Sequence, residues 1–329
     1  MISLTLYGKK HAIEYLYAQH KSGRSSHAVL LYGDEGIGKK TLAQWLSALY
    51  LCEHGAGEGI PCLECAPCKK VMTGNSPDIT LVPHYGVRGG YEVKYLQALT
   101  VEAYVLPNDG DVKVYIFDDC DNISVQCQNI LLKLIEEPPK HCKFIFTARS
   151  RSILLPTVLS RCTAVQVDGA SIEDCKLSLL ENGYDEQAAA QAIESCGNSG
   201  NVGRCLEVAA AQGNQSSPQN TAKAILQAIA NRDEYAMLAA FEAVRRDKQS
   251  LNRTLELTAE LLRDTAVAKV GADSAKGISC DYAFAKSIEK RITISRAQEA
   301  LKALDICADQ LDKNGNVGLI IGNVCTKLV

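Results

Sequence analysis

A glycine-rich segment near the N-terminus has the spacing of a phosphate-binding loop. It reads GDEGIGKKT, and the residues at the required positions are Gly33, Gly36, Gly38 and Lys39. Such glycines let backbone N–H groups turn toward a phosphate at the start of a helix, and the lysine reaches the terminal phosphates. The apolar run 28–32 precedes the loop and a helical pattern follows it, which is the context this chemistry requires. The alternative is a glycine-rich strand-to-helix turn with an incidental lysine.

The position after the loop lysine departs from that pattern. A serine or threonine there would place its hydroxyl on Mg²⁺, whereas this chain has Lys40, whose ammonium offers no lone pair and repels the metal. The carboxylate half of such a site follows a later apolar run, VYIFDDCD, where Asp118 fits the Mg²⁺-associated position. Asp119 stands where many ATPases use glutamate to activate water, and it is one methylene shorter. The sequence therefore predicts a degenerate pocket for ATP or ADP with impaired hydrolysis.

A cluster of cysteines follows in LCEHGAGEGIPCLECAPC. Its members are Cys52, Cys62, Cys65 and Cys68. Two overlapping Cys-x-x-Cys steps with a fourth thiol upstream fit a tetrahedral zinc ion that is structural, because protein ligands fill all four positions. His54 is an alternative ligand to Cys52. Disulfides, which a reducing cytosol disfavours, and a redox pair are the other interpretations. The remaining thiols of the 14 cysteines are expected to be buried and free.

Length and composition limit the class of protein. The 329 residues suffice for two or three domains, and a net charge of -3 with 47% hydrophobic residues is typical of a globular chain. This balance argues against disorder and against a strongly basic surface that coats nucleic acid. The sequence lacks an apolar run of about 20 residues and a signal-peptide pattern at its N-terminus. We therefore expect a cytoplasmic protein that does not enter membranes.

The pattern of apolar residues divides the chain into three parts. Residues 1–167 alternate short apolar runs with helical patterns, which predicts an α/β domain with a parallel sheet covered on both faces. The expected strands are 28–32, 79–82, 112–117, 143–146 and 163–167. Residues 168–212 contain short helical patterns, and from the polar break at 213–220 to residue 329 the pattern is entirely helical.

These features resemble, in their order, the clamp-loader subunits of the AAA+ class, and most closely the δ′ family of bacterial DNA polymerase III. The segments that carry the likeness are HAVLLYGDEGIGKK, the four-cysteine segment, SPDITLVP, VYIFDDCDNIS, NILLKLIEEPPK, FIFTARS and LPTVLSRC. The likeness is dense to about residue 212 and rests beyond it on domain order and on NGNVGLIIGNVCTKLV. It implies an AAA+ P-loop domain with a zinc module at 52–68, a helical lid domain at 168–212 and a helical, oligomerising collar at 213–329.

The resemblance also implies roles for particular residues. Arg161 falls in the serine-arginine-cysteine motif, whose arginine reaches the ATP of a neighbouring subunit; the alternative is that it pairs with a nearby carboxylate. Thr147 falls at the sensor-1 position, although a threonine that ends a strand is commonly a turn former. In the lid, GNVGRCLEV places Gly203, and not Arg204, where active subunits carry the sensor-2 arginine. A shift of one residue turns a helical side chain by about 100°.

The sequence therefore predicts a clamp-loader subunit without ATP turnover of its own, which completes a neighbour's ATP site through Arg161. The implied partners are τ/γ and δ subunits, a sliding clamp, and primer-template DNA contacted through the assembled complex. The alternative is an active ATPase subunit of the τ/γ type. A third hypothesis, a zinc protein with an AAA+-like fold that acts outside replication, leaves the serine-arginine-cysteine motif unexplained.

Overall fold

The structure is a computed structural model of the 329-residue chain. It describes residues 6–54, 61–84, 90–197, 199–211, 217–271, 277, 279, 281–312 and 315–328. The described residues form two compact units, one that ends at Ala170 and one that begins at Ser171. Each unit is described by itself below.

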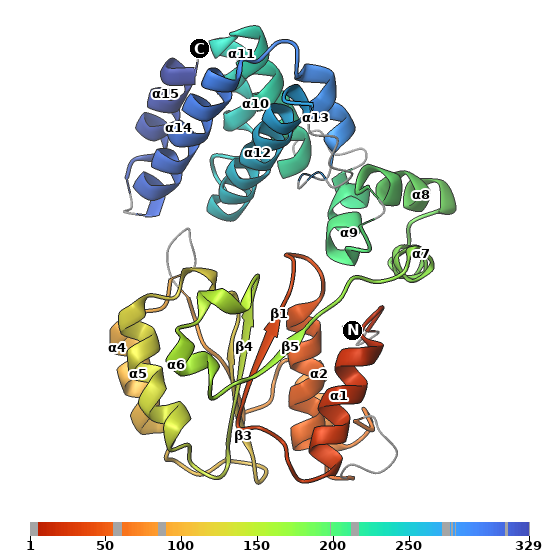
Figure 1. The fold of residues 1–329 in the computed structure, drawn as a ribbon, viewed down its shortest axis with the longest axis vertical. Helices are drawn as coiled ribbons and strands as arrows, with labels where there is room; N and C mark the ends of the chain where they lie inside the picture. The colour runs from red at the N-terminus through yellow and green to blue at the C-terminus, as the bar shows by residue number, and fades with distance from the viewer. Residues whose placement is uncertain are drawn as a thin grey trace. The chain divides into compact units, whose positions relative to one another are not determined.

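The N-terminal unit is built on a five-stranded parallel sheet (Figure 1). Its strands are β1 (Ala28–Tyr32), β2 (Ile79–Leu81), β3 (Lys113–Phe117), β4 (Cys142–Ala148) and β5 (Thr163–Gln166). They are arranged in the order β2-β3-β4-β1-β5, and every neighbouring pair is parallel. The five predicted strands and the α/β fold class are thus confirmed, and no strand end differs from its prediction by more than two residues.

Helices cover both faces of this sheet, as expected (Figure 1). The helices are α1 (Lys10–Lys21) and α2 (Lys39–Leu51) on one face, and α4 (Val93–Glu102), α5 (Val125–Glu136) and α6 (Pro156–Leu159) on the other. Successive strand residues point to opposite faces, so Val29 and Leu31 pack beneath α1 and α2 while Leu30 packs beneath α4 and α5. A short helix, α3 (Ala66–Met72), packs against α2.

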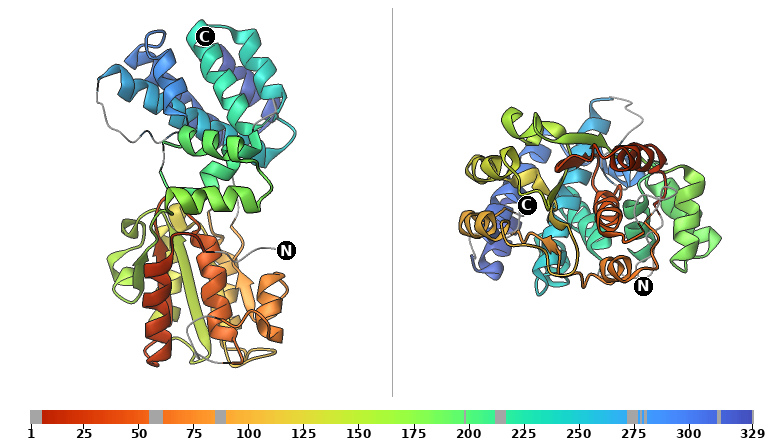
Figure 2. Two further views of the ribbon diagram at one scale, coloured as in Figure 1. Left: turned by 90° about the vertical axis from the view of Figure 1, so that its right-hand side faces the viewer. Right: turned by 90° about the horizontal axis from the view of Figure 1, so that it is seen from below.

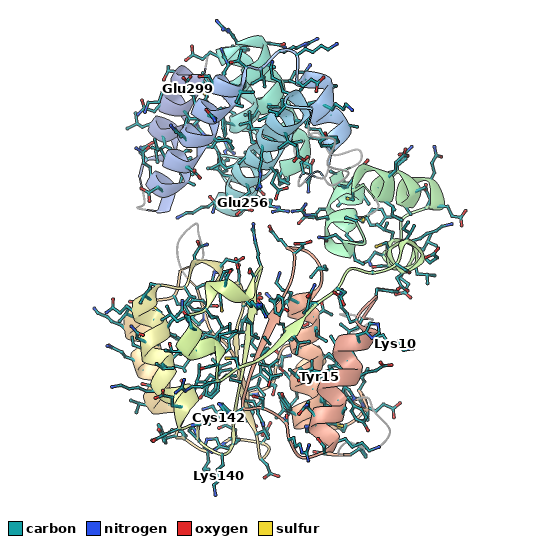
Figure 3. The ribbon with its side chains drawn as sticks, in the orientation of Figure 1. Lys10, Tyr15, Lys140, Cys142, Glu256 and Glu299 are labelled. Carbon is teal, nitrogen blue, oxygen red and sulfur yellow. The ribbon has the colours of Figure 1, made fainter. Side chains whose placement is uncertain are left out.

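Aromatic side chains stiffen the middle of the sheet. Phe117 at the end of β3 stacks on Phe146 of β4 with ring centroids 4.7 Å apart, and both rings are buried. Cys142, labelled in Figure 3, begins β4 and is also buried; its thiol donates to the carbonyl of Ala103 at 3.2 Å. Outside the predicted zinc module every described cysteine is buried except the half-buried Cys162, and all are free, which agrees with the expectation for these thiols.

The C-terminal unit is helical throughout its described part (Figure 2). Its helices are α7 (Ile172–Glu181), α8 (Glu186–Ser195), α9 (Val202–Ala211), α10 (Pro218–Asn231), α11 (Glu234–Glu242), α12 (Lys248–Lys269), α13 (Tyr282–Ile288), α14 (Ile294–Asp312) and α15 (Val317–Leu328). The long helix α12 packs between α10 and α14. Ser171, Asp185 and Ser217 cap helix starts by accepting a backbone N–H, which satisfies a donor that the helix leaves unpaired.

The predicted boundary between lid and collar lies inside this helical unit. Residues 213–216 of the polar break at 213–220 lie outside the described residues, whereas Ser217 caps α10 and 218–220 begin that helix. The chain divides into its two compact units after Ala170, and the described helices beyond that residue belong to one unit. The separation of 168–212 from 213–329 therefore stays a prediction.

Candidate nucleotide pocket and metal centre

The phosphate loop has the backbone that its glycines predict. It connects β1 to α2, and Gly36 and Gly38 take φ values of 76° and 98°, where a side chain would strain the backbone. A Cβ on Gly33 would lie 2.6 Å from the carbonyl oxygen of Val167, so the chain also passes too close there for any other residue. The local structure therefore requires glycine at all three positions.

Lys39 is folded over this loop. Its ammonium donates to the carbonyl oxygens of Gly33 and Asp34, each at 2.8 Å. Burial lowers the pKa of Lys39, while the carboxylates of Asp121 and Asp119 act in the opposite direction. The loop lysine therefore lies where the phosphate-binding lysine is expected, with loop carbonyls as its hydrogen-bond partners.

Lys40, the departure noted in the sequence, reaches the carboxylate predicted for Mg²⁺. Its Nζ lies 3.2 Å from Oδ2 of Asp118. The other oxygen, Oδ1, accepts a hydrogen bond from the Thr147 hydroxyl at 2.7 Å, and the Thr147 oxygen accepts the N–H of Asp119 at 2.8 Å. The hydroxyl of Tyr91 donates to the carbonyl of Asp118. The structure thus brings Lys40, Asp118 and Thr147 together at the carboxyl ends of neighbouring strands.

A Mg²⁺ ion, which a phosphate loop of this kind implies, does not fit the side chains present. Mg²⁺ requires oxygen ligands at about 2.0–2.1 Å in octahedral geometry. Lys40 supplies no lone pair, and its ammonium lies against one oxygen of Asp118 while Thr147 donates to the other. Each oxygen of this carboxylate therefore already has a partner within the chain, and one of these partners is an ammonium that repels a cation.

Asp119 differs from a catalytic glutamate in its environment as well as its length. It has a φ of 52°, in the left-handed region. Burial, followed by the hydrogen bond and charge of Asp121, raises the pKa of Asp119 to about 6. Arg149 opposes this rise and joins the loop to the strand ends, since it pairs with Glu35 at 2.7 Å and with Asp121 at 3.1 Å. The sequence motifs did not indicate a role for this arginine, although it comes shortly after Thr147 in FTARS.

Arg161 lies just after α6 and is held by neighbours on its own domain. Its Nη2 lies 2.8 Å from Oε1 of Glu136 at the end of α5, and its Nη1 donates to the carbonyl of Thr157 at 2.8 Å. The side chain of Arg161 is 39% exposed and that of Glu136 is 40% exposed. The guanidinium therefore has a fixed position and remains accessible from solvent.

The cysteine segment gathers into a compact group of ligand atoms. One ligand atom from each of Cys52, His54, Cys62 and Cys65 lies within 4.8 Å of the other three. Backbone N–H groups of Cys65 and Glu64 lower the pKa of Cys62 to about 6, which favours the thiolate that binds metal. Three thiols and an imidazole with these separations fit the donor set of a tetrahedral zinc site.

Cys68, which the spacing predicted as the fourth ligand, is not in that group of four. It is fully buried against α2, and its Sγ lies 3.9 Å from the carbonyl of Ala48. Burial raises the pKa of the Cys68 thiol, and the neighbouring Cys65 and Cys52 act in the same direction. His54, expected as an alternative to Cys52, instead joins Cys52 in the group. The structure thus offers five donors for four positions.

Arg204 is engaged within the helical unit. Its Nη2 lies 3.1 Å from Oε1 of Glu260 on α12, and both side chains are largely buried, with 15% and 13% exposed. Gly203 precedes it in the first turn of α9. Arg204 therefore has a partner on another helix of its own unit, and the sensor-2 assignment of Gly203 stays a prediction of the resemblance.

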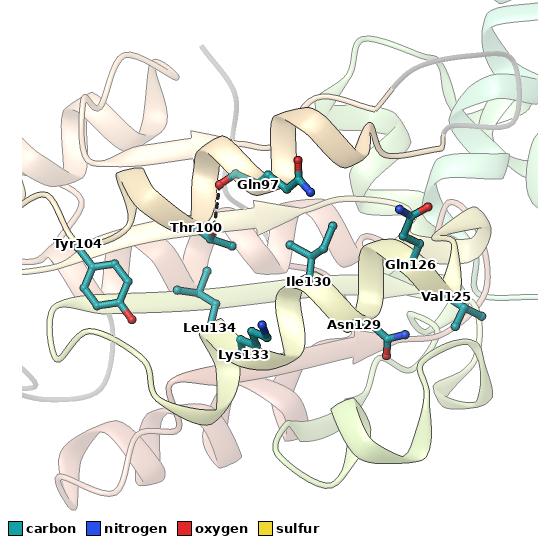
Figure 4. Close-up of a pocket in the computed structure, with 9 residues that line it drawn as sticks. All are labelled: Gln97, Thr100, Tyr104, Val125, Gln126, Asn129, Ile130, Lys133 and Leu134. Atoms are coloured by element: carbon teal, nitrogen blue, oxygen red, sulfur yellow. Dashed lines mark hydrogen bonds between the residues drawn. The ribbon is translucent and has the colours of Figure 1, made fainter.

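A groove between α4 and α5 lies on the face of the sheet opposite α2 (Figure 4). Its lining consists of Gln97, Thr100, Tyr104, Val125, Gln126, Asn129, Ile130, Lys133 and Leu134. This groove is separate from the phosphate loop, and its lining is mainly apolar and amide side chains. Among the helices that the structure describes, none combines the length and the apolar character needed to cross a bilayer.

Comparisons with known proteins agree with this geometry. Residues 8–171 match a family model described as DNA polymerase III, delta subunit. The δ′ subunit of DNA polymerase III from Bacillus subtilis is 34% identical over 147 residues, which cover 45% of this chain and 44% of that protein. The τ subunit from Escherichia coli is 30% identical over 172 residues, 52% of this chain and 26% of that protein. The chain spans about half or less of the length of the curated relatives it matches.

Solved structures give a broader likeness. A DNA polymerase III gamma-subunit-related protein from Thermotoga maritima covers 95% of this chain and 97% of its own, at 16% identity and a TM-score of 0.40. The Bacillus subtilis clamp loader delta protein covers 96% of this chain and 99% of its own, at 10% identity and a TM-score of 0.34.

A parallel sheet with a phosphate loop after β1 and paired aspartates after β3 defines a P-loop protein of the AAA+ class. Together with the match over residues 8–171, it shows that the chain belongs to the DNA polymerase III delta-subunit family that this model describes. The resemblance inferred from the sequence motifs is therefore confirmed. Relatives of the δ′ and of the γ/τ kind match with similar identity, so sequence identity does not distinguish these two kinds of subunit.

Proposed function

We propose that this chain is a δ′-type clamp-loader subunit, which hydrolyses no ATP and supplies Arg161 to the ATP site of a neighbouring subunit. The assembly would open a sliding clamp and load it on primed DNA, with τ/γ and δ subunits as the neighbours. The observation that carries this proposal is the ion pair of Lys40 with Asp118, at 3.2 Å, in the place where an active site holds Mg²⁺. Without that metal, phosphoryl transfer at this loop lacks its main source of charge stabilisation.

The surroundings of Arg161 support the role in trans. A planar guanidinium can bind phosphate oxygens through two parallel hydrogen bonds, and it carries its charge at every physiological pH. Thr157 and Glu136 hold the side chain at the surface without burying it. The nucleotide of a neighbouring subunit that binds there would contact a preorganised positive charge. Glu136 would then lose its ion pair with Arg161 and contact solvent or the neighbouring subunit instead.

The second candidate is an active ATPase subunit of the τ/γ type. Its support is the complete loop backbone with Lys39 in place and the similar identity of γ and τ relatives. The two functions predict opposite effects of substitutions in the loop and at Arg161.

We also propose that the cysteine segment holds a structural zinc ion. Cys52, Cys62 and Cys65 would supply three ligands, and either His54 or Cys68 the fourth. A closed set of four protein ligands leaves no position for substrate, so the ion would fix the segment between α2 and α3.

A crossed comparison in the reconstituted complex tests the function. Arg161→Ala should slow the ATP site that this chain completes by about 10³- to 10⁵-fold, the range known for arginines supplied in trans. Lys39→Ala should leave turnover of the complex unchanged. Arg151→Ala, which removes another exposed arginine of the same domain, is the matched control. Loss of turnover with Lys39→Ala and none with Arg161→Ala would establish the ATPase alternative.

A further inference from the structure

The contact between Lys40 and Asp118 joins two parts of the chain that meet only in the fold. Lys40 is the second residue of α2, directly after the phosphate loop, and Asp118 follows the end of β3. In an active site of this kind, a divalent cation lies between the phosphate loop and this strand end. The 3.2 Å contact between Lys40 and Asp118 joins the same two parts of the chain. The side chain of Lys40 is 57% exposed and that of Asp118 is 19% exposed, so the lysine is the more solvent-accessible member of the pair.

Both oxygens of this carboxylate have partners. Lys40 lies on Oδ2, and the hydroxyl of Thr147 donates to Oδ1 at 2.7 Å. A divalent ion on a remaining lone pair of Asp118 would lie within a few ångströms of an ammonium that repels it. A serine or threonine in place of Lys40 would favour the ion, because its hydroxyl adds a lone pair and the positive charge is removed.

We propose that Lys40 is a built-in cation, whose ammonium takes the place of the divalent ion between the phosphate loop and Asp118. This single residue then decides that the loop recruits no Mg²⁺. The inference rests on the same ion pair as the proposed absence of ATP hydrolysis and deepens that part of the proposed function, because it concerns what the chain's own loop can bind. Arg161 could act on a neighbour whether or not Lys40 excludes a metal here.

Lys39 does not take the place of the divalent ion. Its ammonium is already bound to the loop carbonyls of Gly33 and Asp34, and it occupies the position that contacts phosphate in related loops. The two adjacent lysines therefore have different roles. Lys39 lies at the position that contacts phosphate, and Lys40 lies at the position of the metal ion.

Equilibrium dialysis of the full-length, zinc-loaded chain against Mn²⁺ in the presence of ADP tests the proposal. Lys40→Ser should gain about one Mn²⁺ per chain, with an affinity at least about tenfold above the wild type, because a ligand replaces a repelling charge. The double variant Lys40→Ser with Asp118→Asn should lose this gain, which ties the ion to Asp118. Lys10→Ser is the matched control, since Lys10 is an 84%-exposed lysine on α1 (Figure 3).

Two results would overturn the proposal. The first is a wild-type chain that binds Mn²⁺ as strongly as Lys40→Ser and loses it with Asp118→Asn, which would show that the ammonium does not exclude the ion. The second is a folded Lys40→Ser chain without the gain, which would make the pair an incidental surface contact. Lys40→Thr provides a second variant if the serine chain does not fold. Neither result depends on ATP turnover in the complex, so the role of Arg161 is judged separately.

Discussion

Replacement of Asp119 by asparagine should stabilise the protein at neutral pH. Burial and the neighbouring carboxylate of Asp121 raise the pKa of Asp119 to about 6, so its charged form is unfavourable in the fold. The residue has a φ of 52°, a left-handed conformation that asparagine adopts as readily as aspartate. The substitution therefore removes an unfavourable charge without straining the backbone.

The size of the effect follows from the shift. A rise in pKa from 3.8 to about 6 corresponds to about 3 kcal/mol, at about 1.36 kcal/mol per unit. Solvent still reaches this side chain, and screening reduces the expected gain to about 1 kcal/mol. The folded protein binds this proton more tightly than the unfolded chain does. Stability from this group is therefore full below about pH 4 and is lost as the pH rises toward about 6.

Urea unfolding at acid and neutral pH measures this directly. At neutral pH the free energy of unfolding of Asp119→Asn should exceed that of the wild type by about 1 kcal/mol, or about 2–4 °C in melting temperature. This gap in stability should close toward about pH 4.5. Asp111→Asn, at an exposed aspartate before β3, controls for the change in net charge. A gap that is equal at both pH values, or a less stable variant at neutral pH, would refute the reasoning.

Two further predictions concern the metal and the core. Chelation should remove zinc and speed amide exchange in residues 61–72 while β3 and β4 stay protected, and Cys62→Ser should reproduce that change; identical exchange before and after chelation would count against the metal. Phe146→Ala deletes a buried ring that stacks on Phe117 at 4.7 Å, and it should lower the free energy of unfolding by about 3–5 kcal/mol in urea melts. A loss below about 1 kcal/mol would contradict the packing described for this sheet.

The sheet was predictable because its strands are buried on both faces. Such strands are continuous apolar runs, so β1 and β3 are evident in the sequence: β1 has its predicted bounds, and β3 begins one residue later than predicted. The pairing of Thr147 with Asp118 follows from the same rule, since both residues lie at the carboxyl ends of adjacent parallel strands. Lys40 was identifiable as a departure because the phosphate-loop pattern specifies a hydroxyl there.

Contacts between distant side chains could not be predicted in the same way. Glu136 ends α5 and meets Arg161 only because the chain returns past it after α6, and no periodicity specifies that pair. The placement of His54 beside Cys52, Cys62 and Cys65 could not be foreseen either, because ligand spacing alone permits His54 or Cys68 as the fourth donor. Arg204 pairs with Glu260, which lies on α12, and the sequence contains no pattern that relates these two positions.

The most direct test of the central claim is single-turnover ATP hydrolysis by the reconstituted clamp loader that carries Arg161→Ala. If this chain completes a neighbour's site, the phase that reports that site should slow by about 10³- to 10⁵-fold while nucleotide binding and complex assembly persist. Unchanged rates in every phase, in an assembled complex, would show that Arg161 acts on no ATP site and would contradict the account.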